Sequence, residues 1–282
     1  MDGCRTRRIV VIKLGGSVLV DDDSYRQAAR FLVRRLHKCS AERFVVVVSA
    51  RKGLTDELER LARRITNFPN PRTLDLLWST GELRSVALLT FHLEELGVAA
   101  VGLNVHEMGL RFNGAGQAAA RVDSLSSELQ RAFASHSVAV VPGFFGTNEG
   151  GAITSLGRGG SDLSAVLLAD EFEAAQCELI KDVPGYFTQD PNASSSAVYL
   201  PHISYETAME MAENGCELVQ CVAIEAARER GLQLVVRSLD DTRAGTVVST
   251  HTNQQRSCAV MTDWTTKEVV DESFGEKLKD RR

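Results

Sequence analysis

Leu156-Gly157-Arg158-Gly159-Gly160-Ser161-Asp162 is the most informative stretch of this chain, and Lys13-Leu14-Gly15-Gly16-Ser17 near the start is its counterpart. Each stretch joins one cation to bare glycine backbone, between an apolar strand-like run and a helix-like run. Glycines let backbone amides approach phosphate or carboxylate oxygens, a helix N-terminus adds positive potential, and the cation adds charge. The two stretches therefore predict a site that holds a phosphate-bearing donor and an acidic acceptor together.

The composition is that of an ordinary globular enzyme. Of the 282 residues, 44% are hydrophobic and 24% are charged, so the chain can bury a large core in one α/β domain or in two fused lobes. The net charge of −5, without a basic stripe carrying interleaved aromatics, argues against a nucleic-acid partner. No run approaches the roughly 20 apolar residues that span a bilayer. The apolar run Ile9–Ile12 is followed at once by Lys13, which predicts a strand rather than a signal peptide.

The cysteines and histidines predict neither a metal site nor a disulfide framework. Six of each are scattered along the chain without the paired spacing of metal ligands. Reduced thiols are typical of the cytoplasm. We therefore expect a cytoplasmic protein that builds no metal site of its own.

Apolar runs alternate with amphipathic segments along the first half of the chain. Strands are predicted at Ile9–Lys13, Phe44–Val48, Ala99–Leu103 and Val138–Val141. Helices are predicted over about Ser24–His37, directly after a polar loop at Ser49–Asp56, and over Glu82–Leu96. A break is predicted at Asn67–Arg72 and a loop at Gly143–Gly146. This alternation indicates a mostly parallel sheet with helices on both faces. Ligands of such sheets lie beyond the carboxyl ends of the strands, and the residues that follow strand-like runs there are Lys13, Ser49, Gly143 and Arg158.

Eight short blocks in one order carry a family resemblance. They are Val11–Ser17, Val46–Ala50 with Thr55–Leu58, Ser79–Glu82, Gly143–Gly146, Leu156–Asp162, Asp182–Gly185 with Asp190-Pro191, Ile203–Tyr205, and Val235–Ser238 with Gly245-Thr246. Together they resemble the motifs of aspartate kinases, a branch of the amino acid kinase family. The resemblance covers roughly residues 9–249, which is most of the chain, and ordered blocks are far more specific than a single glycine cluster.

The resemblance implies a fold and a reaction. The fold is α/β, an amino acid kinase-like three-layer αβα sandwich with a mostly parallel central sheet over residues 1–249. Its acceptor lobe is expected over about 1–150 and its nucleotide lobe over about 151–249. The reaction passes the γ-phosphate of ATP, with Mg²⁺, to L-aspartate or a similar acidic small molecule, giving ADP and 4-phospho-L-aspartate. A homodimer is also implied.

The end of the chain is expected to lack a regulatory domain. Many aspartate kinases continue into paired ACT domains that bind end-product amino acids. The residues after Ser249 number fewer than the roughly 50 that an independent domain needs. We expect residues 250–282 to be a short tail without a complete ACT domain, and we expect no feedback by lysine or threonine through such a site.

Roles for individual residues also follow from the resemblance. Lys13 is expected to bridge the acceptor and the transferred phosphoryl group, and Asp162 to fix nearby donors or help organise Mg²⁺. Arg158 would capture an amino acid carboxylate, and Glu82 would face the ammonium group. Further family positions are Ser49, Thr55, Phe144 and Ser161 around the acceptor, and Gly15, Gly16, Ser17, Lys181, Asp182 and Tyr186 around the nucleotide.

Structural roles compete with the functional ones at three of these positions. Glu82 would also suit the first turn of a helix, where the dipole favours a carboxylate. Thr55 would suit an N-cap. Phe144 is as well suited to the core as to the wall of a pocket.

The departures from the family pattern lie on the nucleotide side. Lys181 stands where aspartate kinases usually carry threonine, and Asn192 stands where an arginine commonly follows Asp-Pro. The usual Gly-Ala-Lys-Val-Leu-His-Pro segment reads Gly215–Cys221 here, with Glu217 in place of the lysine and Gln220 in place of the histidine. Losing two cations and gaining an anion beside a triphosphate costs several kcal/mol unless another group compensates. We expect Lys181 to compensate.

Three functions remain open on the sequence. The chain is predicted to be a working aspartate kinase with altered nucleotide contacts. One alternative is a kinase for a related carboxylate or amino acid in a specialised pathway. The other is a non-catalytic relative that binds an acidic amino acid and serves as a sensor or partner subunit.

Overall fold

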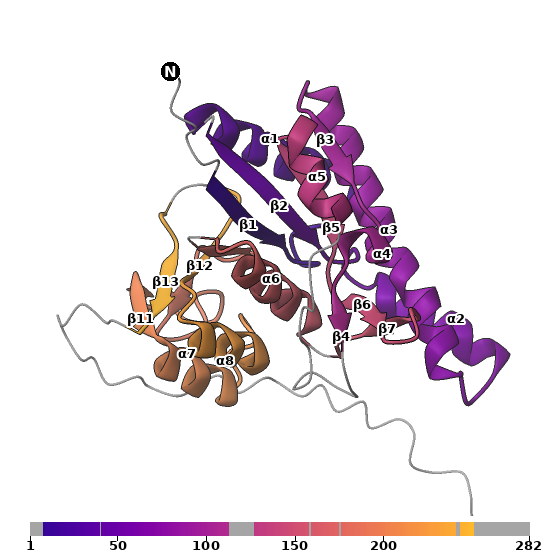
Figure 1. Ribbon diagram of the computed structural model, residues 1–282. Helices are drawn as coiled ribbons and strands as arrows, with labels where there is room; N and C mark the ends of the chain where they lie inside the picture. Colours follow the sequence, from indigo (N-terminus) through magenta and orange to yellow (C-terminus); the bar gives the residue numbers. More distant parts are fainter. Residues whose placement is uncertain are drawn as a thin grey trace, which may run out of the picture.

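A mostly parallel sheet runs through the molecule in the computed structural model (Figure 1), which describes residues 8–39, 41–112, 127–157, 159–174, 176–240 and 243–250. Its strands are β1 (Arg8–Leu14), β2 (Glu42–Val48), β3 (Ala100–Gly102), β5 (Val138–Pro142), β8 (Cys177–Ile180), β11 (His202–Ser204), β12 (Leu234–Arg237) and β13 (Thr246–Ser249). They lie in the order β11-β13-β12-β8-β1-β2-β5-β3. Every neighbouring pair is parallel except β12 and β13, as the alternation of strands and helices predicted.

Helices cover both faces of this sheet. One face carries α1 (Asp22–Lys38) and α3 (Pro71–Glu95). The other carries α5 (Ser127–Ser135), α6 (Gly160–Glu171), α7 (Tyr205–Glu213) and α8 (Cys221–Arg230). The predicted three-layer αβα arrangement is therefore confirmed.

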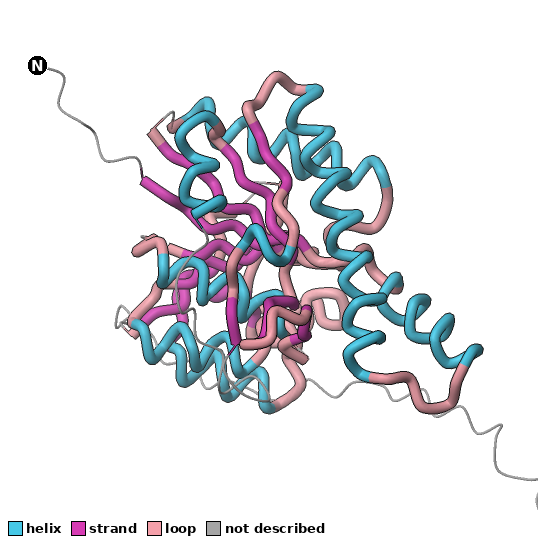
Figure 2. Tube along the Cα trace, turned by 45° about the vertical axis from the view of Figure 1, so that its right-hand side comes forward, coloured by secondary structure: helices cyan, strands magenta, loops and turns pink. Residues whose placement is uncertain are grey.

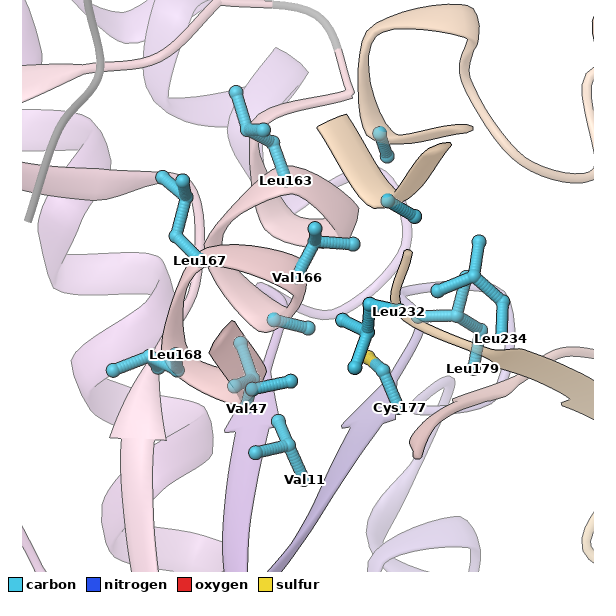
Figure 3. Packing of buried hydrophobic residues seen from close by; sticks show 14 of the residues in the cluster. Val11, Val47, Leu163, Val166, Leu167, Leu168, Cys177, Leu179, Leu232 and Leu234 are labelled. Carbon is cyan, nitrogen blue, oxygen red and sulfur yellow. The ribbon is translucent and has the colours of Figure 1, made fainter. Parts of the chain in front are cut away.

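Burial on both faces explains why the strands are continuous apolar runs. Along β1, Val11 packs into the core beneath α6 while Val10 and Ile12 pack into the core beneath α1. Figure 3 shows the first of these cores, where Val11 and Val47 from neighbouring strands meet the apolar side of α6. The central strands are thereby held rigidly, and so are the loops at their ends.

Smaller elements surround the sheet. They are α2 (Leu54–Ile65), α4 (Val105–Met108), a sheet of β4 (Arg111–Phe112), β6 (Phe145–Asn148) and β7 (Ile153–Ser155), and a pair of β9 (Tyr186–Phe187) and β10 (Tyr199–Leu200). Helix α2 and the start of α3 form a hairpin that projects from the body in both views (Figures 1 and 2). Among the helices of the described residues, none is long and apolar enough to cross a membrane.

Helix α3 begins eleven residues earlier than the sequence analysis predicts, at Pro71 instead of Glu82. The proline was assigned to a break, but proline suits the first position of a helix because its missing N–H has no partner there. Asn70 caps this end by accepting a hydrogen bond from the backbone N–H of Arg72 at 3.0 Å. Glu82 therefore lies in the middle of α3, and the first-turn interpretation of its carboxylate is wrong.

Two other local predictions are corrected by the structure. Helix α2 begins at Leu54, with Gly53 at the N-cap in the left-handed region (φ 81°), so Thr55 lies inside the first turn and is not the cap. Phe145 and Gly146, predicted as loop, begin strand β6 instead. The apolar spacing along α2 does predict a helix, yet Ile65 at its end is 81% exposed because the hairpin reaches beyond the core.

Candidate active site

Loops from three neighbouring strands meet at the carboxyl ends of β1, β2 and β5. The Ser49 N–H donates to the Leu14 carbonyl at 3.2 Å, and the Gly143 N–H donates to the Val48 carbonyl at 2.8 Å. The Lys52 N–H also donates to the Gly16 carbonyl at 3.2 Å. These backbone bonds hold the glycine turn after β1 directly against the loop after β2. The predicted convergence of loops at this edge is therefore realised in the fold.

One buried carboxylate lies between two lysines at this edge. Lys13 Nζ is 2.7 Å from Asp162 Oδ1, and Lys181 Nζ is 2.9 Å from Asp162 Oδ2. Lys13 comes from β1, Asp162 from the first turn of α6, and Lys181 from the position after β8. Strand β1 and the consecutive elements α6 and β8 thus place two ammonium groups and one carboxylate in a space largely closed to water.

Burial and mutual attraction set the protonation of this cluster. Burial lowers the pKa of Lys13 to about 8, although Asp162 opposes the shift. Burial alone would raise the pKa of Asp162, but Lys13 and Lys181 outweigh it and lower that pKa to about 2. Asp162 is therefore an anion that orients lysines rather than a base, and Lys13 remains largely charged at neutral pH.

Two glycines around the start of α6, Gly159 and Gly143, have no room for a side chain. Gly159 has φ 77°, and a Cβ there would stand 2.5 Å from the Gln220 Cβ. A Cβ on Gly143 would stand 3.0 Å from the Ser161 Cβ. A side chain at Gly159 would push the start of α6 away from the start of α8, and one at Gly143 would push α6 away from the end of β5; either shift would carry Asp162 with it. Arg158, the cation of this turn, lies outside the described residues.

A second carboxylate approaches the same loops from α3. Glu82 is 3% exposed, and its Oε1 accepts a hydrogen bond from the backbone N–H of Ala50 at 3.2 Å. Its Oε2 is buried and has no hydrogen-bond partner within the described part of the chain. Burial raises the pKa of Glu82 to about 7. An unpaired, buried carboxylate oxygen of this kind suits a cationic ligand group.

Replacing Glu82 by glutamine should stabilise the protein above neutral pH. Because the pKa is raised from its ordinary 4.5 to about 7, the contribution of Glu82 to stability is full below its ordinary pKa and is lost as the pH rises through 7. The free energy of unfolding of Glu82→Gln should equal that of the wild type near pH 4. Near pH 8 it should be larger than that of the wild type by up to about 3 kcal/mol. Urea unfolding at both pH values measures the difference. Glu95→Gln, at the exposed end of the same helix, should not reproduce it.

A cavity of about 420 Å³ lies beside the lysine–aspartate cluster. Its wall includes Ser17, Lys181, Asp182 and Tyr186, four of the residues expected around the nucleotide. The Ser17 hydroxyl donates to Asp182 Oδ1 at 3.4 Å, which joins the glycine turn after β1 to this wall.

Three of the residues that depart from the family pattern, Lys181, Asn192 and Glu217, line the same cavity, whereas Gln220 does not. Asn192 and Glu217 both belong to its wall, as Lys181 does. Glu217 is exposed. Lys181 is thus a cation that contacts the buried carboxylate and borders the cavity at once.

The comparisons with known proteins identify the family. A model of the amino acid kinase family matches residues 8–238. The chain belongs to the amino acid kinase family. It is 35% identical over 252 residues to the aspartokinase of Geobacillus stearothermophilus, covering 89% of this chain and 61% of that one. It is 38% identical over 240 residues to the aspartokinase of Thermus thermophilus, covering 85% and 59%. The chain thus spans about three fifths of the length of these relatives.

Solved structures place this amino acid kinase near the same branch. The aspartate kinase of Synechocystis superposes with a TM-score of 0.75 at 35% identity, covering 86% of this chain and 40% of that one. E. coli aspartokinase III, solved in complex with aspartate and ADP, superposes with a TM-score of 0.72 at 27% identity, covering 88% and 66%.

Two residues of this amino acid kinase were missed in the sequence analysis. Ser164 on α6 accepts a hydrogen bond from the Phe144 N–H at 3.1 Å and holds Phe144 at φ 69°, in the left-handed region. Trp78 on α3 has its ring centroid 6.4 Å from that of Phe144. Trp78 stands immediately before the Ser79–Glu82 block, and a spacing of four from Glu82 on one helix was the available signal.

The other expected acceptor residues are near the strand ends. Ser49 and Thr55 lie on the loop after β2 and on the first turn of α2, both half-buried. Ser161 packs against Gly143 at the start of α6. Phe144 is half-buried and lies over the first turn of that helix, where a Cβ on Gly160 would stand 2.8 Å from its ring.

Proposed function

We propose that this chain transfers the γ-phosphate of ATP to the side-chain carboxylate of L-aspartate, giving ADP and 4-phospho-L-aspartate. The observation that carries the proposal is the cluster of Lys13, Asp162 and Lys181 between the acceptor loops and the nucleotide cavity. Aspartokinase relatives of 35–38% identity support the choice of acceptor. The lobe of about residues 1–150 would hold most of the acceptor, and the lobe of about residues 151–249 would hold most of the nucleotide.

The cluster has the charge that the reaction needs. An acceptor oxygen forms a bond to the γ-phosphorus while the bond to the ADP oxygen breaks, and negative charge gathers on the phosphoryl oxygens. Lys13 would stabilise that charge and draw the acceptor carboxylate towards the phosphorus. The acceptor is already ionised at neutral pH, so no general base is needed. Asp162, with its low pKa, would keep both lysines aimed at the transferred group.

Magnesium would arrive with the nucleotide. Among the described residues, no three His, Cys, Asp or Glu side chains are grouped as metal ligands, and both oxygens of Asp162 already face lysines. Mg²⁺ is commonly held by substrate phosphates with one or two carboxylates. Asp182, an exposed carboxylate on the cavity wall, fits that part. Bound there, the ion would neutralise charge on the phosphates.

Lys181 would replace a missing phosphate cation of the family. Lys181→Ala should weaken ATP binding by about 10-fold or more, because a hydrogen bond from a cation to a phosphate would be lost in a cavity that Glu217 also lines. Calorimetry with a non-hydrolysable ATP analogue measures the change. Lys38→Ala, at the exposed end of α1, is the matched control. Unchanged affinity in Lys181→Ala would show that Lys181 does not compensate.

A coupled assay of ADP release tests the proposed reaction. Purified protein is supplied with ATP or GTP and with L-aspartate or a panel of other carboxylates and amino acids. Turnover with L-aspartate supports the proposal, and turnover only with another acceptor favours a kinase for a related carboxylate. Tight binding of an acidic amino acid without turnover favours a sensor or partner subunit.

Assembly and location complete the proposal. The family resemblance supports a homodimer, which light scattering on the purified protein would test. Cys39, Cys177, Cys216 and Cys221 are free thiols, which supports a reducing compartment such as the cytoplasm.

A further inference from the structure

Helix α3 presents one face to three separate parts of the acceptor region. The Asp75 carboxylate accepts a hydrogen bond from the Ser155 N–H of β7 at 3.2 Å. Trp78 contacts Phe144, and Glu82 accepts the hydrogen bond from Ala50. Residues 75, 78 and 82 are three, four and seven apart, so they share one side of the helix. Figure 1 shows α3 passing beside β6 and β7 along this side.

Two polar groups on this face are buried without partners. Trp78 Nε1 and Glu82 Oε2 each lack a hydrogen-bond partner within the described residues. They belong to residues four apart on a helix, which puts them about one turn from each other. Leaving a buried donor or acceptor unpaired is costly, and such groups are rare in native proteins, so each calls for a cause such as a bound ligand, an ion or a water. The face therefore offers one N–H donor and one carboxylate oxygen, carried by residues about one helical turn apart.

The pair matches the head group of an amino acid. A carboxylate oxygen such as Glu82 Oε2 suits an ammonium group, and an indole N–H, which can only donate, suits a carboxylate oxygen. An α-amino acid carries both groups on one carbon atom. A simple dicarboxylate lacks the ammonium group that would face Glu82. A β-amino acid without an α-carboxylate lacks the group that would accept the hydrogen bond from the indole.

We propose that Trp78 is a specificity-determining residue whose Nε1–H donates to the α-carboxylate of the acceptor amino acid. This inference rests on the proposed function. The indole is held in place because Phe144 packs against it, and Phe144 is itself fixed by Ser164. Arg158 keeps its expected role on the same carboxylate, so loss of the indole N–H weakens acceptor binding without abolishing it.

Calorimetry with three ligands tests the assignment. L-Aspartate, β-alanine (no α-carboxylate) and succinate (no ammonium) are titrated into wild type and Trp78→Phe, which keeps the aromatic contact but removes the donor. Trp78→Phe should lower the affinity for L-aspartate by about 10-fold. Its affinity for β-alanine should equal that of the wild type. Phe91→Leu, an exposed aromatic on the same helix (67% exposed), should change neither affinity.

A fluorescence measurement reports on Trp78 without replacing it. The chain has two tryptophans, so Trp264→Phe leaves Trp78 as the sole indole. Its emission should shift with L-aspartate and not with β-alanine. If Trp78→Phe lowers the affinities for L-aspartate and β-alanine equally, the Trp78 assignment is wrong. It is also wrong if the tryptophan emission does not change when L-aspartate is added. Both conclusions hold even if the wild type phosphorylates aspartate. Failure of wild type to bind any of the three ligands overturns both this assignment and the proposed acceptor.

Discussion

Lys13→Met should reduce kcat for aspartate phosphorylation by about 1000-fold. The side chain keeps a similar length and apolar stem but loses the ammonium group that lies 2.7 Å from Asp162. Removing one preorganised hydrogen-bond donor that stabilises a transition-state charge lowers kcat by roughly 100- to 1000-fold. Because Lys13 carries a full buried charge, we expect the larger loss. Steady-state ADP release at saturating ATP and aspartate measures the loss.

The control for Lys13 separates catalysis from binding. Lys38→Met makes the same chemical change at an exposed position on α1 and should leave kcat unaltered. Lys13 is not part of the wall of the nucleotide cavity, so Lys13→Met should still bind the ATP analogue in calorimetry. Near-normal turnover in Lys13→Met would refute its role in phosphoryl transfer.

Asp162→Asn should destabilise the protein by about 3–5 kcal/mol, because it leaves two buried lysines without their shared counter-ion. Lys13 and Lys181 lie within 3 Å of opposite oxygens of this carboxylate. An amide can accept from one lysine only, and its N–H₂ group would face the other. Urea unfolding near pH 7 measures the free energy lost, and turnover should fall along with it because both cations lose their orientation.

The difference in unfolding free energy between wild type and Asp162→Asn should depend on pH, because the pKa of Asp162 is lowered. The pKa of Asp162 is lowered to about 2, so its stabilising contribution is present above its ordinary pKa and is lost as the pH falls through 2. The gap between wild type and Asp162→Asn should therefore narrow in acid.

Asp170→Asn is the matched control for Asp162→Asn. Asp170 lies on the same helix, where it pairs with Arg230 at 3.0 Å, but its side chain is 50% exposed. An exposed pair contributes about 0–1 kcal/mol. Equal losses in the two variants would mean that the buried cluster has no special importance.

The sheet and its loops were predictable because their signals are local. The apolar runs around Val11 and Val47 are continuous since both faces of each strand are buried. The glycines at 15, 16, 159 and 160 mark turns whether or not the rest of the fold is known. Pro71 was misinterpreted for the same reason: a proline marks an irregular point locally, but the same residue begins a helix when a cap precedes it.

The partners of the charged residues were not predictable in this way. Lys181 is an isolated departure from the family pattern in sequence, and only the parallel pairing of β8 with β1 puts it beside Asp162. In sequence, only its spacing of four from Glu82 distinguishes Trp78 from an apolar core residue of α3. Its unpaired Nε1 becomes visible only when the contacts around Phe144 are known.

The amino-acid sequence alone determined the alternation of strands and helices in the first half of the chain, the glycine turns expected to face a charged ligand, and the family whose motifs it carries in order. Tertiary structure alone decided that Lys13 and Lys181 share one carboxylate and that Glu82 is buried with one oxygen that no described residue hydrogen-bonds. The reason is physical. Backbone conformation depends on neighbours along the chain, whereas the pKa and the pairing of a buried side chain depend on groups that folding brings from elsewhere in the chain, such as Lys13 to Asp162.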